Sequence, residues 1–219
     1  MSNYSKRKVL INTELPGLYL ITDDRRSKNR PVEEIVSEAL EGGIKMIQYR
    51  PDRIKDEQFL EKARLLRKMT AEYGCKLIIN DRVDIALLSD ADGVHIGKGD
   101  LPVGDIRSLL GADKLIGYSA HDADEAEEVQ ASGVDFMTYS PIFPTTSSSK
   151  PRDVVGVEKL VEILDKFRIT IPVYPLGGIG LNQITALKKS GINRAAVVTA
   201  ITEQGDIKSA VEILTAAQK

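Results

Sequence analysis

Acidic side chains follow two short apolar runs in the middle of the chain. Asp81 comes directly after KLIIN (76–80), and Asp100 follows GVHIG (93–97). Magnesium sites in proteins commonly use one or two carboxylates together with substrate phosphates and water. The pair therefore predicts a Mg²⁺ site. The alternative is that each carboxylate caps the helix that follows it.

Cationic and polar side chains end another apolar run, IKMIQYR (44–50). Gln48 and Arg50 are two residues apart, so on a strand they project to the same side. The planar guanidinium of Arg50 suits bidentate binding of phosphate oxygens. A strand-end salt bridge between Arg50 and the nearby Asp52 is the alternative.

Glycines and a hydroxyl end two further runs near the C-terminus. Gly177 and Gly178 lie in LGGIG (176–180), and Thr199 lies in AAVVTAI (195–201). Backbone N–H groups can approach a phosphate closely where glycine removes the side chain, and a following helix N-terminus favours negative charge. These segments predict a phosphate site, with tight turning as the alternative use of the glycines.

The segment SPIFPTTSSSKPRDVVG (140–156) is rich in Ser, Thr and Pro and too long for a simple turn. It predicts a mobile active-site loop in which Thr145, Thr146 and Lys150 close over an anionic ligand, although a solvated linker has a similar composition.

His121, after the run KLIGYS, is a candidate acid or base near neutral pH. A helix-capping or solvated histidine is the alternative there.

Eight short apolar runs must position these side chains. They are residues 17–22, 44–50, 76–80, 93–97, 114–119, 135–140, 172–178 and 194–200. Amphipathic patterns separate them, so the chain predicts repeated βαβ units and a closed (β/α)8 TIM barrel, with an open doubly wound sheet as the alternative. We expect one domain over residues 1–219, with residues 1–15 as an N-terminal extension. In such a barrel the polar residues after each run meet at the carboxyl ends of the strands, where active sites lie.

Composition excludes several classes of partner. The 219 residues include 32 acidic and 30 basic side chains, for a net charge of -2. The overall charge of the chain therefore does not favour binding to nucleic acid or to an anionic membrane. No run of about 18 apolar residues is present. The single cysteine, Cys75, cannot form an internal disulfide. We expect a cytoplasmic protein that binds small phosphorylated molecules; both a monomer and a homo-oligomer fit this composition.

Several segments occur in the order typical of one enzyme family, and over nearly its whole length the chain resembles the thiamine phosphate synthase and TenI family. The segments are IQYR, INDRVDIAL, ADGVHIGKGDLP, IGYSAH, SPIFPT, LGGI and AVVTAI. The resemblance implies a phosphate-binding (β/α)8 barrel. It also implies that a hydroxymethylpyrimidine diphosphate is joined to a thiazole phosphate, with Mg²⁺ as cofactor and diphosphate as the leaving group.

The resemblance further implies a role for each matching residue. Diphosphate would be bound by Gln48, Arg50 and Asn80, the metal by Asp81 and Asp100, and the pyrimidine by Ser119. The thiazole phosphate would lie near Thr145, Thr146, Gly177, Gly178, Val198 and Thr199. Arg50, Lys150 and His121 are the predicted catalytic residues, with Lys150 reaching the diphosphate from its loop.

Three departures from the synthase pattern keep other readings open. Asp52 stands where the pattern Q-x-R-x-K has lysine, Lys98 replaces a usual glutamine, and the loop ends in SKP as in TenI-like relatives. A metal-independent thiazole tautomerase with His121 as base is therefore one alternative, and a non-catalytic relative that binds thiazole or thiamine phosphate is another. The presence of both Asp81 and Asp100 favours the synthase.

Overall fold

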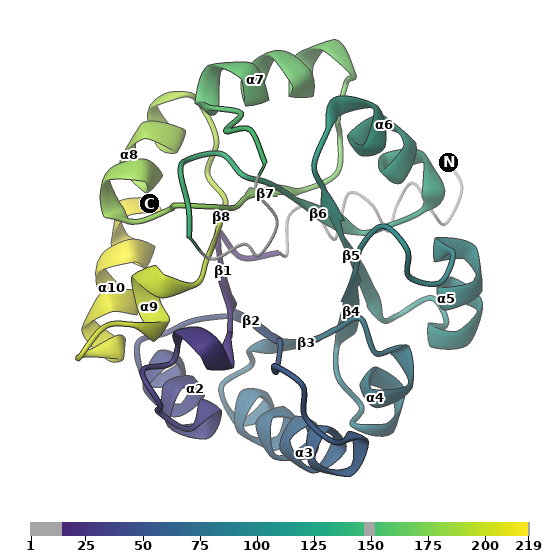
Figure 1. The fold of residues 1–219 in the computed structure, drawn as a ribbon, viewed down its shortest axis with the longest axis vertical. Helices are drawn as coiled ribbons and strands as arrows, with labels where there is room; N and C mark the ends of the chain where they lie inside the picture. Colours follow the sequence, from purple (N-terminus) through teal and green to yellow (C-terminus); the bar gives the residue numbers. More distant parts are fainter. Residues whose placement is uncertain (1–14, 147–151, 219) are drawn as a thin grey trace.

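The computed structural model describes residues 15–146 and 152–218. Eight strands form a ring that is surrounded by helices (Figure 1). The strands are β1 (Leu18–Ile21), β2 (Met46–Tyr49), β3 (Lys76–Asn80), β4 (Gly93–Ile96), β5 (Leu115–Ala120), β6 (Phe136–Tyr139), β7 (Val173–Pro175) and β8 (Ala195–Val197). Seven lie within the predicted runs, and β5 extends one residue beyond its run, to Ala120.

All the strand pairs are parallel, in the order β7-β6-β5-β4-β3-β2-β1-β8. Strand β1 is hydrogen-bonded to both β2 and β8, and β7 and β8 lie against each other at the remaining junction. The sheet is therefore a nearly closed barrel, which confirms the predicted (β/α)8 fold. The open doubly wound sheet is wrong, because each strand follows its predecessor around the ring without a reversal of order.

The helices cover the outside of the barrel (Figure 1). They are α2 (Val32–Glu41), α3 (Asp56–Glu72), α4 (Val83–Leu88), α5 (Val103–Leu110), α6 (Ala123–Ser132), α7 (Val157–Lys166), α8 (Leu181–Lys189), α9 (Thr199–Thr202) and α10 (Ile207–Gln218), and a 3-10 turn, η1 (Asp24–Arg26), follows β1. Helix α2 shows how the pattern works: it begins after Pro31, ends at Gly42, and buries the apolar face that includes Ile35 and Ala39.

Alternation along the strands divides the core into two layers. On β1, Leu18 and Leu20 pack against the helices, whereas Tyr19 and Ile21 belong to the cluster inside the barrel. On β2, Met46 joins the same interior cluster. Gln48, two residues along, therefore points into the barrel rather than toward the helices.

Two further expectations can be compared with the described residues. Cys75 is buried, and burial raises the pKa of its thiol to about 12, as expected of a structural rather than a reactive cysteine. Within residues 15–146 and 152–218, no helix has both the length and the apolar character needed to cross a membrane.

Gly117 on β5 allows the barrel interior to pack, since an added Cβ would lie 2.4 Å from the Phe136 ring and 2.5 Å from Nδ1 of His95. We expect Gly117→Ala to lower the free energy of unfolding by about 1–3 kcal/mol, the usual cost of overpacking a core. Gly104 in α5 is the matched control: a Cβ there meets nothing within 4 Å, so Gly104→Ala should be neutral or stabilising by roughly 0.5–1 kcal/mol. Urea denaturation measures both, and equal effects would contradict this account of the interior.

Candidate functional site

A cavity of about 640 Å³ opens at the carboxyl ends of the strands. Its lining includes many of the predicted site residues, namely Arg50, Ser119, His121, Thr145, Gly177, Gly178, Val198 and Thr199. These residues come from β2, β5, β6, β7 and β8 or from the segments that follow those strands. The fold thus brings together side chains that are up to 149 residues apart, as the predicted barrel requires.

The glycines after β7 are required by a close approach of two loops. Gly177 and Gly178 have φ angles of 100° and 63°, and a Cβ on Gly178 would lie 2.3 Å from the carbonyl oxygen of Pro144. The amide of Phe143 donates to the carbonyl of Gly177 at 3.1 Å. The tight-turn role that was the alternative for these glycines is therefore confirmed. It is compatible with a phosphate site, because the same glycines line the cavity beside Val198 and Thr199, where α9 begins.

Arg50 is held by a buried carboxylate that the sequence analysis missed. In the parallel register Ile21 lies opposite Gln48, so two residues further along Asp23 lies beside Arg50. Asp23 is 3% exposed, and its Oδ2 accepts a hydrogen bond from Nη2 of Arg50 at 2.9 Å. The proposed salt bridge between Arg50 and Asp52 is wrong, since Asp23 is the partner.

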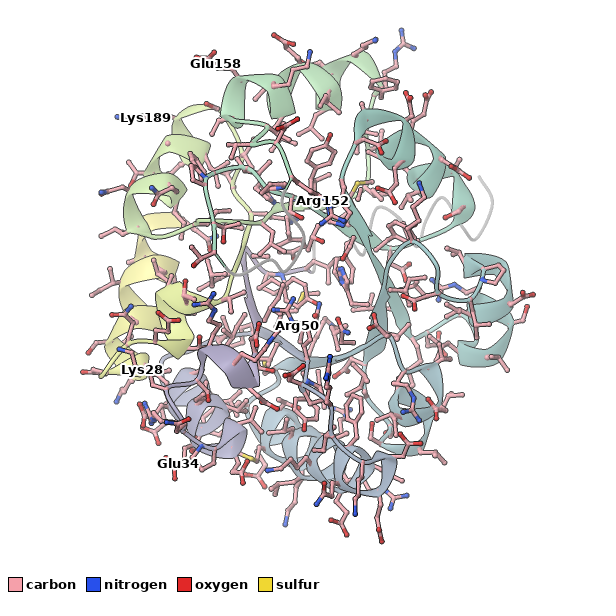
Figure 2. All side chains as sticks on the ribbon, viewed as in Figure 1. Lys28, Glu34, Arg50, Arg152, Glu158 and Lys189 are labelled. Carbon is pink, nitrogen blue, oxygen red and sulfur yellow. The ribbon has the colours of Figure 1, made fainter. Side chains whose placement is uncertain are left out.

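A second arginine converges on the same carboxylate. Oδ1 of Asp23 accepts hydrogen bonds from the backbone amide of Arg25 at 3.0 Å and from its Nε at 3.2 Å. The side chain of Arg25 is half exposed and lines the cavity together with Arg50 and Arg152. Figure 2 shows Arg50 and Arg152 over the middle of the ring of strands. One carboxylate thus lies between two guanidinium groups, and Arg152 is a third arginine in the lining.

The signal for this cluster was present in the sequence. Asp23 and Arg25 follow the first apolar run just as Arg50 ends the second. The predicted site residues all follow the later runs, so Asp23 and Arg25, which follow the first run, were not among them. Arg152 was overlooked for a different reason, because it follows the Ser- and Thr-rich part of a loop whose path cannot be derived from composition.

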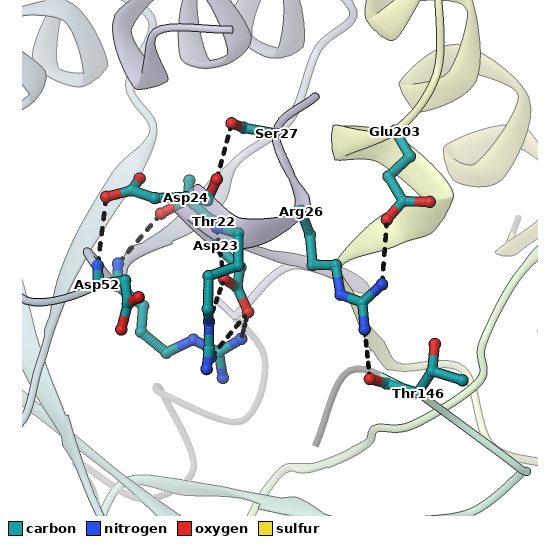
Figure 3. Close-up of polar contacts among 10 residues, drawn as sticks. Thr22, Asp23, Asp24, Arg26, Ser27, Asp52, Thr146 and Glu203 are labelled. Atoms are coloured by element: carbon teal, nitrogen blue, oxygen red, sulfur yellow. Dashed lines mark hydrogen bonds and ion pairs between the residues drawn. The ribbon is translucent and has the colours of Figure 1, made fainter. Parts of the chain in front are cut away.

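Asp52 does not line the cavity, although it is only two residues from Arg50 in the sequence. Strand β2 ends at Tyr49, and after Pro51 the chain turns so that Asp52 is exposed. Its backbone amide donates to Oδ2 of Asp24 at 3.2 Å (Figure 3). Lys98 is exposed too and is not among the residues that line the main cavity.

Asp81 and Asp100 are close enough for their side chains to interact, but neither is among the residues that line this cavity, and Asp100 lines a separate pocket. Loss of hydration around the Asp81 carboxyl, and then the charge of Asp100, raises the pKa of Asp81 to about 6, although the residue is exposed. A hydrogen bond with Asn80 and the charge of Arg50 oppose this rise. Oδ2 of Asp100 accepts from the amide of Gly97 at 2.7 Å. Two carboxylates are thus brought together, and Arg50 offsets their repulsion only in part.

The helix-capping alternative for this pair is wrong. The residue preceding α4 is Arg82, the residue preceding α5 is Pro102, and neither helix has a side-chain cap. Asp81 has a φ of 60° and belongs to the turn after β3.

The acid pair fits Mg²⁺ as part of a site completed by other oxygen ligands. Among the described residues there is no group of three or more His, Cys, Asp or Glu side chains that could hold a metal ion alone. Magnesium retains several waters and is often bound through one or two carboxylates plus substrate phosphates. The raised pKa of Asp81 is also what a cation between the two carboxylates would reverse.

His121 faces the cavity from the end of β5. Its Nδ1 lies 3.0 Å from the carbonyl oxygen of Ser140, and its backbone amide donates to Glu125 at 2.8 Å. Oγ of Ser140 lies 3.2 Å from the same nitrogen. With a proton on Nδ1 the ring donates to the carbonyl, which can only accept, and Nε2 is then the nitrogen that can accept a proton.

The loop after β6 approaches η1 across the cavity. Arg26 donates to the carbonyl oxygen of Thr146, and its guanidinium lies 3.8 Å from Oε1 of Glu203 (Figure 3). Thr145 lines the cavity next to this contact. Lys150, the predicted catalytic residue of the loop, lies outside the described residues, as does most of the expected N-terminal extension.

The site and fold agree with what the chain is similar to. A protein-family model described as thiamine monophosphate synthase matches residues 18–201. The thiamine-phosphate synthase of Shouchella clausii is 40% identical over 202 residues, covering 92% of this chain and 96% of the relative. That of Clostridium tetani is 39% identical over 198 residues, covering 90% and 93%.

Solved structures give the same result. The thiamine phosphate pyrophosphorylase of Pyrococcus furiosus superimposes with a TM-score of 0.83 at 35% identity, covering 95% of this chain and 97% of that one. A 3-hexulose-6-phosphate synthase aligns with a TM-score of 0.69 at 20% identity, which indicates a shared fold alone.

The raised pKa of Asp81 has a consequence for stability without metal. The folded state binds a proton at Asp81 more tightly than the unfolded chain does, so the free energy of unfolding falls as pH rises from about 4 to about 6. Above that range the destabilisation by the ionised carboxylate is fully present. We expect Asp81→Asn to raise the melting temperature at pH 7 and to leave it unchanged at about pH 4. Asp113→Asn, an exposed change in the turn after α5, should show no such difference. An equal effect of Asp81→Asn at both pH values would contradict the crowding of the two carboxylates.

Arg25 should contribute to anion binding. We expect Arg25→Gln to weaken the binding of inorganic diphosphate, measured by calorimetry, by about tenfold, because a charged hydrogen bond is worth roughly 1.5–3 kcal/mol and Arg25 is partly screened by water. Arg53→Gln removes the same charge from an exposed position that does not line the cavity, and should change affinity less than about twofold. Equal losses in the two variants would mean that only overall charge matters.

Proposed function

Because the chain belongs to the thiamine monophosphate synthase family, we propose that its cavity joins a hydroxymethylpyrimidine diphosphate to a thiazole phosphate and releases diphosphate. The protein is accordingly a transferase of thiamine biosynthesis. Its substrates are small phosphorylated molecules, which suits a cavity with cationic groups in a chain whose net charge is only -2.

One observation carries the assignment of substrates to parts of the cavity. Two candidate anion sites follow neighbouring strands. The cluster of Asp23, Arg25 and Arg50 follows β1 and β2, and the glycine corner, made of Gly177, Gly178, Val198 and Thr199, follows β7 and β8. Strand β1 pairs with both β2 and β8, so the two sites adjoin. A reaction between two phosphorylated substrates requires two such sites beside each other.

The diphosphate end is assigned to the side of the cavity where opposite charges meet. Arg50 and Arg25 bind the diphosphate oxygens and Asn80 adds an amide. Lys150, which lies outside the described residues, keeps its predicted role as a further cation for the diphosphate. Asp81 and Asp100 would hold Mg²⁺, which when bound neutralises charge on the departing diphosphate. Because these groups are positioned before the reaction, they stabilise the leaving group without reorganisation.

The chemical step needs positioning more than proton transfer. The bond between the pyrimidine methylene carbon and the diphosphate oxygen breaks, and both electrons leave with diphosphate. The lone pair of the thiazole nitrogen then forms the new carbon–nitrogen bond to that methylene. Ser119 holds the pyrimidine side, whereas Gln48, predicted to bind diphosphate, is buried in the barrel interior and donates to Tyr19 instead. The protein therefore contributes mainly orientation and electrostatic stabilisation.

The thiazole phosphate is assigned to the glycine corner. Gly177, Gly178, Val198 and Thr199 present backbone amides and a hydroxyl where the short helix α9 begins. The loop after β6 adds the hydroxyls of Thr145 and Thr146. The left-handed conformation of Gly178 and its contact with Pro144 keep this loop near the corner.

A thiazole tautomerase is the second reading, and one observation favours it. Nε2 of His121 is available as a base at the cavity, because Nδ1 is engaged by the carbonyl of Ser140. The tautomerase has no use for an acid pair, however, whereas the synthase does. A cytoplasmic location and a homo-oligomer stay predictions in either case.

The decisive experiment measures thiamine phosphate formation from both substrates with and without Mg²⁺. We expect turnover that depends on Mg²⁺ and is lowered at least about a hundredfold in Asp81→Asn, because loss of a metal ligand removes charge stabilisation worth several kcal/mol. His121→Asn should lower it less than about tenfold, a loss smaller than that typical of a general base. Asp113→Asn serves as the matched carboxylate control.

Other outcomes separate the alternatives. Metal-independent conversion of the thiazole phosphate that is lost in His121→Asn would replace the synthase with a tautomerase. Tight binding of thiazole phosphate with no turnover of any kind would identify a non-catalytic relative. Either result would overturn the proposed reaction while leaving the fold unchanged.

A further inference from the structure

A chain of buried polar groups crosses the barrel interior and ends at the cavity. Nε2 of Gln48 donates to the hydroxyl oxygen of Tyr19 at 2.8 Å, and that hydroxyl lies 3.4 Å from Nδ1 of His95. On the other side of the ring, Nε2 of His95 lies 3.0 Å from Oγ of Ser119. Ser119 lines the cavity, whereas Tyr19, Gln48 and His95 are at most 2% exposed. The chain therefore connects the interior of the barrel to one ligand-facing hydroxyl.

The imidazole in this chain is neutral. Burial, and secondarily the positive charge of Arg50, lowers the pKa of His95 to about 3. A neutral imidazole has one nitrogen that donates and one that accepts, and its hydrogen bonds determine which is which. The direction of the chain is therefore set by what each neighbour can donate.

Tyr19 sets the direction at Nδ1. Its oxygen already accepts from Gln48, so its own hydrogen is left to donate, and Nδ1 of His95 is the acceptor within reach. If Nδ1 carried the proton instead, the hydroxyl hydrogen of a fully buried tyrosine would have no acceptor among its described contacts, which costs free energy. Nδ1 accepts, and the ring proton lies on Nε2.

The proton on Nε2 of His95 then determines the orientation of the Ser119 hydroxyl. Nε2–H of His95 donates to Oγ of Ser119 at 3.0 Å, which is nearer than Oγ1 of Thr138 at 3.4 Å. The hydroxyl of Thr138 donates weakly to the same Ser119 oxygen at 3.5 Å. An oxygen that accepts from two donors on the interior side directs its own hydrogen away from them. For Ser119 that direction is the cavity.

We propose that His95 is a positioning residue, locked by Tyr19 with its proton on Nε2, which makes the Ser119 hydroxyl a fixed donor to an acceptor atom of the bound ligand. A ring nitrogen or carbonyl oxygen satisfies that donor. A ligand N–H or C–H at the same place leaves it unpaired. The identity of the ligand as a pyrimidine rests on the proposed function, whereas the direction of the chain does not.

The ring proton is observable directly. Nitrogen-15 NMR should show that the ring of His95 is neutral at pH 7, with a protonated Nε2 and an unprotonated Nδ1. Tyr19→Phe should shift its population toward the other tautomer, because Nδ1 loses its donor. A proton on Nδ1 of His95 in the wild-type protein would overturn the proposal, whatever reaction the protein catalyses.

The effect on ligand choice is tested by binding rather than turnover. Calorimetry compares the hydroxymethylpyrimidine with two analogues in which one or the other ring nitrogen is replaced by C–H. We expect one analogue to bind the wild-type protein about tenfold more weakly, since it leaves the Ser119 donor unpaired. In Tyr19→Phe the same replacement should cost about threefold or less, because the hydroxyl of Ser119 is then free to turn.

Tyr174→Phe is the matched control. Tyr174 is another buried tyrosine of the barrel interior, packed against Tyr19, but its hydroxyl donates to the carbonyl of Pro16 at the other end of the barrel. Its removal should leave the tenfold difference between the ligands unchanged. An equal penalty in the wild-type protein and Tyr19→Phe would overturn the proposal. The proposal would also be overturned if the analogue penalty became smaller by the same factor in Tyr19→Phe and Tyr174→Phe, because that result would point to general loosening of the core.

Failure of this inference differs from failure of the proposed function. A protein that binds the pyrimidine with the expected discrimination but forms no thiamine phosphate retains the His95 chain and loses the synthase assignment. A protein that forms thiamine phosphate with a proton on Nδ1 of His95 retains the synthase and loses the chain. Should Tyr19→Phe not fold, Ser119→Ala replaces it, and the analogue penalty must then disappear.

Discussion

Hydrogen bonding of β1 to both β2 and β8 is the constraint on which the rest of the molecule depends. It brings the carboxyl ends of the first and last strands together, so that the groups predicted to bind anions, from the two ends of the chain, share one cavity. It also creates an enclosed interior in which alternate side chains have no access to water. A polar residue inside must then be hydrogen-bonded to another interior residue, as Gln48 and His95 are.

Charge at the cavity is arranged by burial as much as by residue type. The buried carboxylate of Asp23 orients two guanidinium groups, those of Arg25 and Arg50. On the next strands, loss of hydration and the charge of Asp100 raise the pKa of Asp81, and Arg50 opposes this rise only in part. The proposed metal complex of diphosphate would place an anion at the first group and a cation at the second.

Much of the fold was predictable because its signals are local. The strands match the short apolar runs to within one residue, and the helix before Gly42 follows from an amphipathic pattern with a glycine stop. Ser119, near the end of β5, and Thr199, just after β8, line the cavity as predicted for the same reason. The synthase family was identifiable from motifs in order. The helix-cap reading of Asp100 failed because the turn after β4 continues to Pro102 before α5 begins.

The sequence by itself determined the alternation of strands and helices, the chemical types available at each strand end, and the family. Only the tertiary structure decided which charges pair. Arg50 meets Asp23, which is 27 residues away in the chain, because the β1–β2 register places Ile21 opposite Gln48. The nearer Asp52 is carried into solvent by the turn at Pro51. Spacing along a chain limits local contacts, whereas register between strands depends on packing of the whole barrel, and no single segment contains that information.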